Sequence, residues 1–289
     1  MLRVLGLILL SSCLAAQTSA PPPHPENSQD ENSRKAKDLI DKAIAALGGQ
    51  AYLTSKNRVE EGRFYSFYHG ASRGAGTLYR MYRQFPDKER FEVLKRTAKL
   101  IPIPLVGVIV VTGHAKDKED LVLIHDGDKG YEITYKGTAA EDHKATDAYV
   151  RRRLHSLDWV LRTWINQPGV AFFYEGVTVA GEKPAEQVTV SSANNDSVTL
   201  YIDQSTFLPI KTGYTFRDPE DKQRSTEEEL FDGYRAVQGV MTPGSVTRYL
   251  NGDMSAQRFI TTTNYNQEFP ADTFEATISY DPYKSQPKK

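Results

Sequence analysis

Two spacings of hydrophobic residues divide this chain. Shortly after a polar stretch, apolar residues recur every three or four positions, as they do on one face of a helix. Ser33 precedes this segment as an N-cap candidate, and Gly48-Gly49 ends it. The sequence therefore predicts a short amphipathic helix, whose apolar face consists of Ala36, Leu39, Ile40, Ala43 and Leu47.

Beyond Gly49, hydrophobic and polar residues alternate in segments that are typical of half-buried strands. Pro86-Asp87 and Asp126-Gly127 mark turns between consecutive segments, which favours antiparallel pairing. The predicted strands cover residues 58–68, 76–84, 88–96, 106–112, 119–125, 129–135, 170–180, 185–192, 197–203, 208–217, 224–234, 244–250 and 256–266. This pattern predicts a mainly antiparallel β fold with helices (α+β), built on one large curved sheet or an incomplete barrel.

One long helical pattern interrupts the strands, from about Asp142 to Asn166. Its apolar residues recur at steps of four and three, and most of its charged residues fall off that stripe. Pro168-Gly169 ends the pattern. The stripe predicts a helix that lies on an apolar surface, with Val150, Leu154, Leu157, Leu161 and Trp164 as the contacting residues.

A long apolar run from Leu100 to Val111 contains two prolines in its first half. Because proline lacks an N–H donor, a regular central strand or helix is not expected there, and the first part is predicted to be an irregular apolar loop. Two interpretations stay open: a loop tucked into the core, or the lip of an apolar cavity that also uses the helical stripe. The second makes Leu100, Ile101, Ile103, Leu105, Val150, Leu154, Leu157, Leu161 and Trp164 the candidate ligand-binding residues.

The N-terminal residues have the order of a secretory signal, with Arg3 before an apolar run that ends at Leu10. Leu10-Ser11-Ser12-Cys13 matches a lipobox, in which the thiol of Cys13 is acylated, whereas Ala15-Ala16 would suit ordinary signal cleavage. The predicted organisation is a signal segment in residues 1–20, a disordered polar tether in 14–32, a single domain in 33–275 and a polar tail in 276–289.

Composition and motifs exclude several classes of site. The net charge is −1 and the pI is ≈ 6.6, so no overall charge favours nucleic acid. Cys13 is the single cysteine, and no two histidines have ligand spacing, so no disulfide, metal or cofactor is predicted. No nucleophile motif is present, and no catalytic residue is assigned. The arginines at 151–153 could meet phosphate or lipid headgroups, but they are interpreted as a solvated helix face. Most of the glutamates at 60–61 and 227–229 are interpreted as surface residues.

Four stretches of the chain carry a resemblance to a known family. They are residues 85–92, with Pro86-Asp87-Lys88 and Arg90; His125-Asp126-Gly127 with Tyr131; residues 200–209, from Leu200 to Pro209; and the closing segment with Gly233-Tyr234, Gly239-Val240, Pro243, Phe269-Pro270 and Phe274. Together they resemble the LolA/LolB-like superfamily of bacterial envelope proteins. The resemblance implies a half-barrel with a helical lid, whose apolar cavity receives lipoprotein acyl chains in the best-known members.

These observations predict a non-enzymatic, monomeric envelope protein of a Gram-negative-type bacterium that binds a lipid, a lipidated protein or another apolar ligand. It would be periplasmic, either anchored to the outer membrane through Cys13 or released. Two alternatives stay open. One is a tethered interaction module whose core is filled by its own side chains, and the other is a hydrolase whose site is assembled from distant residues.

Overall fold

The computed structural model describes residues 25–74, 76–103 and 107–283. Its helices are α1 (Pro25–Leu47), α2 (Gln50–Thr54), α3 (His143–Leu154), α4 (Leu157–Arg162) and the 3₁₀ helix η1 (Trp164–Asn166). Its strands are β1 (Asn57–Tyr68), β2 (Ala71–Ser72), β3 (Thr77–Gln84), β4 (Lys88–Ile103), β5 (Gly107–Asp126), β6 (Lys129–Thr134), β7 (Gly137–Ala140), β8 (Ala171–Ala180), β9 (Lys183–Ser191), β10 (Ser197–Asp203), β11 (Pro209–Arg217), β12 (Arg224–Asp232), β13 (Arg235–Val237), β14 (Val240–Thr242), β15 (Ser245–Leu250) and β16 (Asp253–Tyr265).

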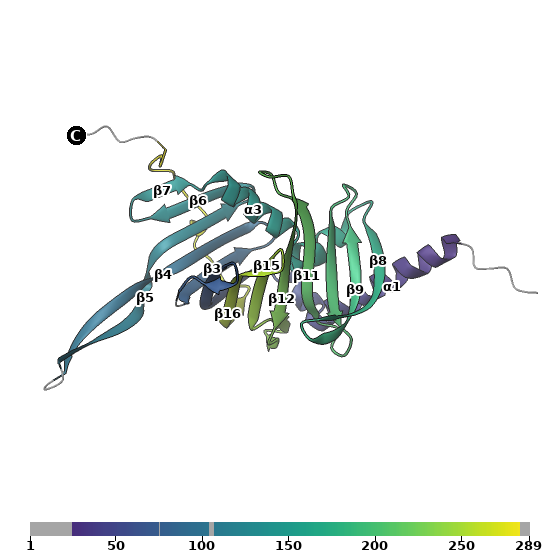
Figure 1. The fold of residues 1–289 in the computed structure, drawn as a ribbon, viewed down its shortest axis with the longest axis horizontal. Helices are drawn as coiled ribbons and strands as arrows, with labels where there is room; N and C mark the ends of the chain where they lie inside the picture. The colour runs from purple at the N-terminus through teal and green to yellow at the C-terminus, as the bar shows by residue number, and fades with distance from the viewer. Residues whose placement is uncertain (1–24, 75, 104–106, 284–289) are drawn as a thin grey trace, which may run out of the picture.

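One large antiparallel sheet dominates the fold (Figure 1). Its strand order is β7-β6-β5-β4-β3-β1-β16-β15-β12-β11-β10-β9-β8, with β2 paired to β1, while β13 and β14 form a separate ribbon. The first and last long strands, β1 and β16, pair with each other and join the two halves of the sheet. The edges β7 and β8 do not pair, so the sheet is open, and the predicted mainly antiparallel class is confirmed.

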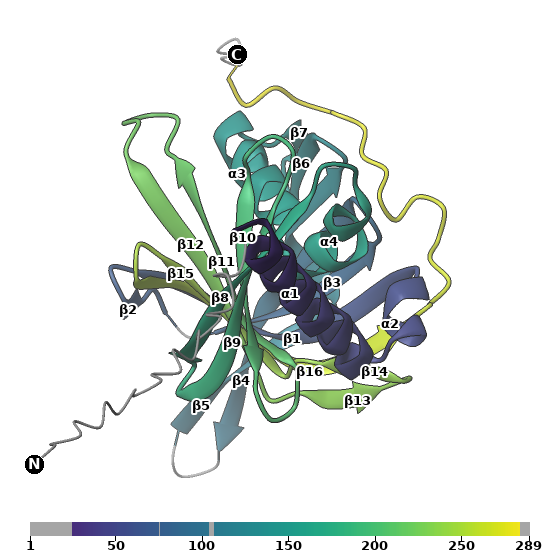
Figure 2. The same ribbon diagram turned by 90° about the vertical axis from the view of Figure 1, so that its right-hand side faces the viewer.

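The chain passes from one edge of the sheet to the other through α3, α4 and η1, because β7 and β8 are consecutive in sequence. Figure 2 shows these helices together with α1 on the same side of the sheet. The helical connection therefore crosses the inner face of the sheet, where it can cover a cavity.

Helix α1 provides the apolar core of one half of the sheet. Its predicted face is buried, and it packs with Val160 and Leu161 of α4 against the valines and leucines of β9 and β10. The helix begins at Pro25, so residues 25–32, which the sequence analysis assigns to the tether, are helical. A helix that packs along a sheet can extend beyond its apolar stripe, because tertiary packing outweighs the weak propensity of a polar end.

The central helix is two helices rather than one. Helix α3 ends at Leu154, and α4 begins at Leu157 with Ser156 as its N-cap. The hydroxyl of Ser156 accepts a hydrogen bond from the backbone N–H of Trp159 at 3.3 Å. Serine is a favoured N-cap residue, so a new helix can start after Ser156 although the apolar stripe continues. The prediction of one continuous helix is therefore wrong.

The predicted irregular loop at Leu100 is wrong, since Leu100–Ile103 continue β4 and pair with Val110 to Gly107 of β5. The two strands predicted at 106–112 and 119–125 are likewise one strand, β5. Beyond Val93, β4 pairs with β5 alone, so Pro102 lies on an edge, where its missing N–H breaks no ladder. Figure 1 shows this hairpin projecting away from the body of the sheet.

The outer face of the sheet is covered by the segment that follows β16. Phe269 and Phe274 pack there with Val122 and Ile124 of β5. Further on, the backbone N–H of Ser279 donates to the carbonyl of Thr138 at 2.8 Å. Part of the stretch predicted as a polar tail therefore lies along β7.

We expect Gly62→Ala to destabilise the protein, because a Cβ at this position would lie 2.0 Å from the carbonyl oxygen of Phe259. Gly62 lies where the β1–β16 register shifts, so the clash is with backbone and is not relieved by a side-chain rotation. The expected loss is about 2 kcal/mol of unfolding free energy. Urea unfolding measures it.

Gly213→Ala is the matched control, since its Cβ would meet Glu228 Cγ at an ordinary 3.4 Å. Equal effects of the two substitutions would contradict the packing argument.

Candidate functional site

A cavity of ≈ 990 Å³ lies between the helical connection and the sheet. Strands β1, β3, β4, β5, β12, β15 and β16 contribute to one wall, and α3, α4 and the end of α2 contribute to the other. Its volume is at the upper end of the range for small-molecule sites. The sheet half that forms it is the half that α1 leaves uncovered.

The cavity is amphiphilic, whereas the sequence predicted an apolar one. Its apolar side chains include Leu53, Phe64, Met81, Phe85, Phe91, Leu123, Trp159 and Val246. Its charged side chains include Arg83, Glu89, Glu141, Arg152, Arg153, Asp158, Arg162, Glu229, Arg248 and Arg258. A ligand that fits these walls has both an apolar part and a polar part.

Of the residues predicted to bind the ligand, the described side chains of Val150, Leu154, Leu157, Leu161 and Trp164 do not line this cavity. Leu161 and Trp164 are buried in the core formed with α1, and Leu157 packs against that core. Val150 and Leu154 are half-buried on α3 and are not among the residues that line the cavity. The backbones of Leu100, Ile101 and Ile103 are in the β4–β5 hairpin, and Leu105 and Cys13 lie outside the described residues.

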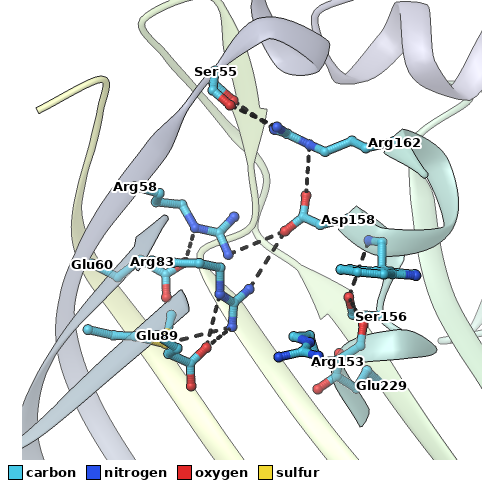
Figure 3. A network of polar contacts seen from close by, with 12 residues as sticks. Ser55, Arg58, Glu60, Arg83, Glu89, Arg153, Ser156, Asp158, Arg162 and Glu229 are labelled. Carbon is cyan, nitrogen blue, oxygen red and sulfur yellow. Dashed lines mark hydrogen bonds and ion pairs between the residues drawn. The ribbon is translucent and has the colours of Figure 1, made fainter. Parts of the chain in front are cut away.

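Asp158 is the centre of the polar contacts drawn in Figure 3. Three guanidinium groups approach its carboxylate: Arg58 at 3.6 Å, Arg83 at 3.7 Å and Arg162 at 3.7 Å. The hydroxyl of Tyr52 donates to Asp158 Oδ1 at 3.0 Å. Burial acts to raise the pKa of Asp158, but the three arginines outweigh it and hold the pKa below its ordinary value. One residue of α4 is thereby tied to β1, β3 and α2.

Glu60 of β1 is a second shared carboxylate, and it is only 1 % exposed. Its two oxygens lie 3.1 Å from Arg58 Nε and 3.1 Å from Arg258 Nη1. The expectation that Glu60 is a surface residue is therefore wrong. A carboxylate so deeply buried is stabilised by cations on both sides.

A third group joins α3 to β12 and β15. Glu227 Oε1 lies 3.8 Å from Arg152 Nε and 3.4 Å from Arg248 Nε, and Arg248 also contacts Glu229 at 3.1 Å. Glu227 is buried and is not the surface residue predicted from its sequence. Burial, and next the neighbouring guanidinium of Arg248, hold the pKa of Arg152 below its ordinary value. The environment of Arg152 therefore disfavours its positive charge.

Arg153 is held by backbone and rings instead of by a carboxylate. Its Nη1 donates to the carbonyls of Asp87 at 3.2 Å and of Gly127. Its guanidinium lies 5.5 Å from the centre of the Trp159 ring. Among the described residues no carboxylate lies within ion-pair distance of it.

We define the arginine network as the cavity arginines with Arg58, which shares their carboxylates. Its arginines are Arg58, Arg83, Arg152, Arg153, Arg162, Arg248 and Arg258, and the carboxylates paired with them are Glu60, Glu89, Asp158, Glu227 and Glu229. Arginines outnumber carboxylates by two in this described set. Among the described residues that line the cavity itself, eight are arginine or lysine and four are aspartate or glutamate. The cavity wall is positively charged although the whole chain carries a net charge of −1.

His125 and Glu141 form a polar pair at one end of the cavity. His125 Nε2 lies 2.9 Å from Glu141 Oε2, and the hydroxyl of Thr146 donates to the same oxygen at 2.8 Å. The imidazole stacks on Tyr149 with 3.5 Å between ring centres. Within the described ranges, His125 has no side-chain hydroxyl as a hydrogen-bond partner, so the pair lacks the nucleophile of a hydrolytic triad.

The described residues form neither a metal site nor a membrane-spanning helix. No group of three or more His, Cys, Asp or Glu side chains in that part of the chain is placed to hold a metal ion. No described helix is long and apolar enough to cross a membrane.

Two features of the sequence point to this site. The solvated helix face predicted for Arg151-Arg152-Arg153 is wrong for two of the three: Arg152 and Arg153 line the cavity. Arg151 packs 3.8 Å from the ring centre of Phe216. Arg58 and Glu60 also occupy alternate, inward positions of β1. Charged residues at the buried positions of a strand were the informative feature.

No protein-family model matches this sequence, and a search of curated proteins found no match. Solved structures do match. A DUF1329 family protein from Desulfovibrio piger covers 83 % of this chain and 97 % of its own, with 10 % identity and a TM-score of 0.53. A putative outer membrane lipoprotein-sorting protein domain from Vibrio parahaemolyticus covers 84 % and 97 %, with 8 % identity and a TM-score of 0.52.

The chain has a LolA-like fold. The resemblance drawn from the sequence motifs is therefore confirmed for the fold. With identities of 10 % and 8 %, the two matches show the fold alone. A LolA superfamily protein from Nitrosomonas europaea matches more weakly, with 10 % identity, a TM-score of 0.45, and coverage of 83 % and 97 %.

We expect Asp158→Asn to cost about 3 kcal/mol of unfolding free energy, because three arginines lose the carboxylate they share. Since the pKa of Asp158 is lowered in the folded protein, its contribution is present above its unfolded pKa of about 4 and is lost as the pH falls through the folded pKa. The difference between wild type and variant should therefore shrink below about pH 4. Urea unfolding at several pH values measures it.

The control is Asp38→Asn, which removes an exposed pair with Lys42 and should cost less than about 0.5 kcal/mol. A difference for Asp158→Asn that stays constant down to pH 2 would argue against the ion-pair account.

Proposed function

We propose that this protein is a non-enzymatic protein of the bacterial envelope that binds a lipid, a lipoprotein acyl chain or another amphiphilic molecule in the cavity. The cavity of ≈ 990 Å³ is the observation that carries this proposal. A module with a filled core, the main alternative, would leave no such space between its helices and its sheet. In this proposal α3 and α4 act as the lid of a half-barrel.

The apolar walls supply the driving force for binding. Phe64, Phe91 and Leu123 come from three different strands and face the same space. Burying an acyl chain there contributes about 0.8 kcal/mol for each CH₂ group, before the costs of association. A cavity with such walls favours a chain-bearing ligand over a small polar one.

The fold supports the same class of function. The Vibrio parahaemolyticus match is described as a putative outer membrane lipoprotein-sorting protein domain. A shared fold at 8 % identity supports a lipid-handling role only by analogy. The main support for this role is the cavity. The signal-like N-terminus and Cys13 place the protein in the envelope in this proposal, and mass spectrometry of the mature N-terminus tests whether Cys13 is acylated.

The β4–β5 hairpin is the second part of the proposal. The backbones of Leu100 and Ile101 pair with those of Val110 and Ile109, and all four residues are apolar. Lysines and one arginine flank this stretch, at positions 95, 96, 99, 116 and 118. An apolar end with a basic border suits contact with an anionic lipid surface, from which a ligand could be taken or to which it could be delivered.

We expect Ala148→Trp to reduce lipid binding at least about tenfold, because the indole would occupy the cavity that Ala148 lines. Native mass spectrometry of the detergent-free protein with dodecanoate, dodecanol, lysophosphatidylglycerol and lysophosphatidylcholine measures binding. Ala45→Trp is the control, as Ala45 is an exposed alanine of α1. Wild-type protein that binds none of the four molecules would refute the proposed function.

The double substitution Ile101→Asp with Ile109→Asp should weaken association with phosphatidylglycerol vesicles about tenfold or more, because it places charge on the apolar end of the hairpin. Vesicle flotation measures this association. Val177→Asp with Val179→Asp, at exposed apolar positions of the edge strand β8, is the matched control. Equal flotation of the two double variants would remove the hairpin from the proposal.

A further inference from the structure

The arginine network contains more positive charge than the folded protein neutralises. Asp158 is shared by three arginines, and Glu60 and Glu227 are each shared by two. Burying uncompensated charge is costly, and proteins rarely retain it without a use. An anion that entered the cavity would find guanidinium groups already in place.

Arg152 is the least neutralised arginine that has a carboxylate partner. Its contact with Glu227 is 3.8 Å long, and Arg248 approaches the same oxygen more closely, at 3.4 Å. Glu227 is further engaged by the hydroxyl of Tyr214, which donates to its other oxygen at 2.7 Å. Burial, and next the neighbouring Arg248, lower the pKa of Arg152 in spite of the opposing effects of Glu227 and Glu229.

Arg153 follows Arg152 in the sequence, and its guanidinium is held in position without a carboxylate partner among the described residues. Two carbonyls, of Asp87 and Gly127, accept from Nη1 and fix the group in position. Carbonyl partners orient an arginine without cancelling its charge, and Arg153 Nε is buried without a hydrogen-bond partner. Both arginines line the cavity, and both belong to the last turn of α3.

We propose that the cavity selects an amphiphile with an anionic headgroup, a carboxylate or a phosphate, and that Arg152 and Arg153 bind this headgroup while the aromatic and aliphatic wall holds the chain. The inference rests on the proposed function and adds the chemistry of the ligand to it. Guanidinium groups suit both anions because their N–H donors match the geometry of two oxygens. Phe91 and Leu123, on the sheet wall of the same cavity, are positioned to meet the apolar part.

The neighbouring Arg151 provides a matched control. It carries the same charge on the same turn, but its guanidinium lies over Phe216 and it does not line the cavity. Arg151→Gln and Arg152→Gln therefore change the net charge equally and differ only in where the charge is removed.

The test measures binding of dodecanoate and dodecanol, and of lysophosphatidylglycerol and lysophosphatidylcholine, to the wild type, Arg151→Gln, Arg152→Gln and Arg152→Lys by isothermal titration calorimetry. We expect each anionic ligand to bind at least about tenfold more tightly than its neutral or zwitterionic counterpart. Arg152→Gln should remove most of that preference and leave dodecanol binding unchanged. Arg152→Lys should restore part of it, and Arg151→Gln should behave as the wild type.

Thermal unfolding separates this role from a structural one. Because the environment of Arg152 disfavours its charge, Arg152→Gln should unfold at the same temperature as the wild type or higher, although it loses affinity. A preference for dodecanoate would identify a fatty acid as the source of the anion, and a preference for lysophosphatidylglycerol a phospholipid; both support the inference.

Two results would overturn it. Equal binding of the anionic and uncharged ligands, or equal effects of Arg151→Gln and Arg152→Gln, would refute headgroup recognition while leaving the proposed lipid binding intact. Failure of every ligand to bind the wild type would refute both.

Discussion

The carboxylate of Asp158 is the contact that allows a helical connection to lie over a sheet without filling the space beneath it. The chain must travel from β7 to β8, at opposite edges of the sheet. Its last part is fixed by the apolar core, where Val160 and Leu161 are fully buried. The side of α4 that faces the cavity has no such core, and Asp158 holds it through long arginine side chains from β1 and β3. These ion pairs connect α4 to the sheet across a gap. Aliphatic side chains would have to pack in direct contact and would leave no cavity between the two.

The same sheet therefore serves two purposes on its inner face. Strands β9 and β10 present Val188, Val190 and Leu200 to α1 and form a dry core. Strands β1, β3 and β4 present Phe64, Met81 and Glu89 to the cavity. The alternation of strand residues is identical in both halves, and only the chemistry of the inward positions differs. Stability resides in the first half, and the space for a ligand in the second.

Much of the fold was accessible from the sequence because it depends on local patterns. The helix face from Ala36 to Leu47 and the antiparallel order followed from periodicity and turn residues. The break at Ser156 did not follow from these patterns, because it depends on a helix cap that competes with a continuous apolar stripe. The pairing of Leu100 with Val110 did not follow either, because it depends on a sheet edge that forms only in the folded protein. The site was missed for a related reason. Whether Glu60 or Glu227 is surface or interior depends on which partners the sheet brings to it, and these partners come from positions as far away as Arg258.

The distribution of charge argues that the polar half of the sheet is built for more than cohesion. A network designed only to hold α4 in place would match each arginine with a carboxylate, as Arg83 and Glu89 are matched. Arg152 departs from this pattern, because its half-buried guanidinium lies near Arg248 and gains only a long contact with a carboxylate that is already engaged. A charge matched this weakly adds little to the stability of the empty protein. A residue that contributes little to the empty state and faces a cavity is best explained by what the cavity receives, and an anion is the partner that would pair with its charge.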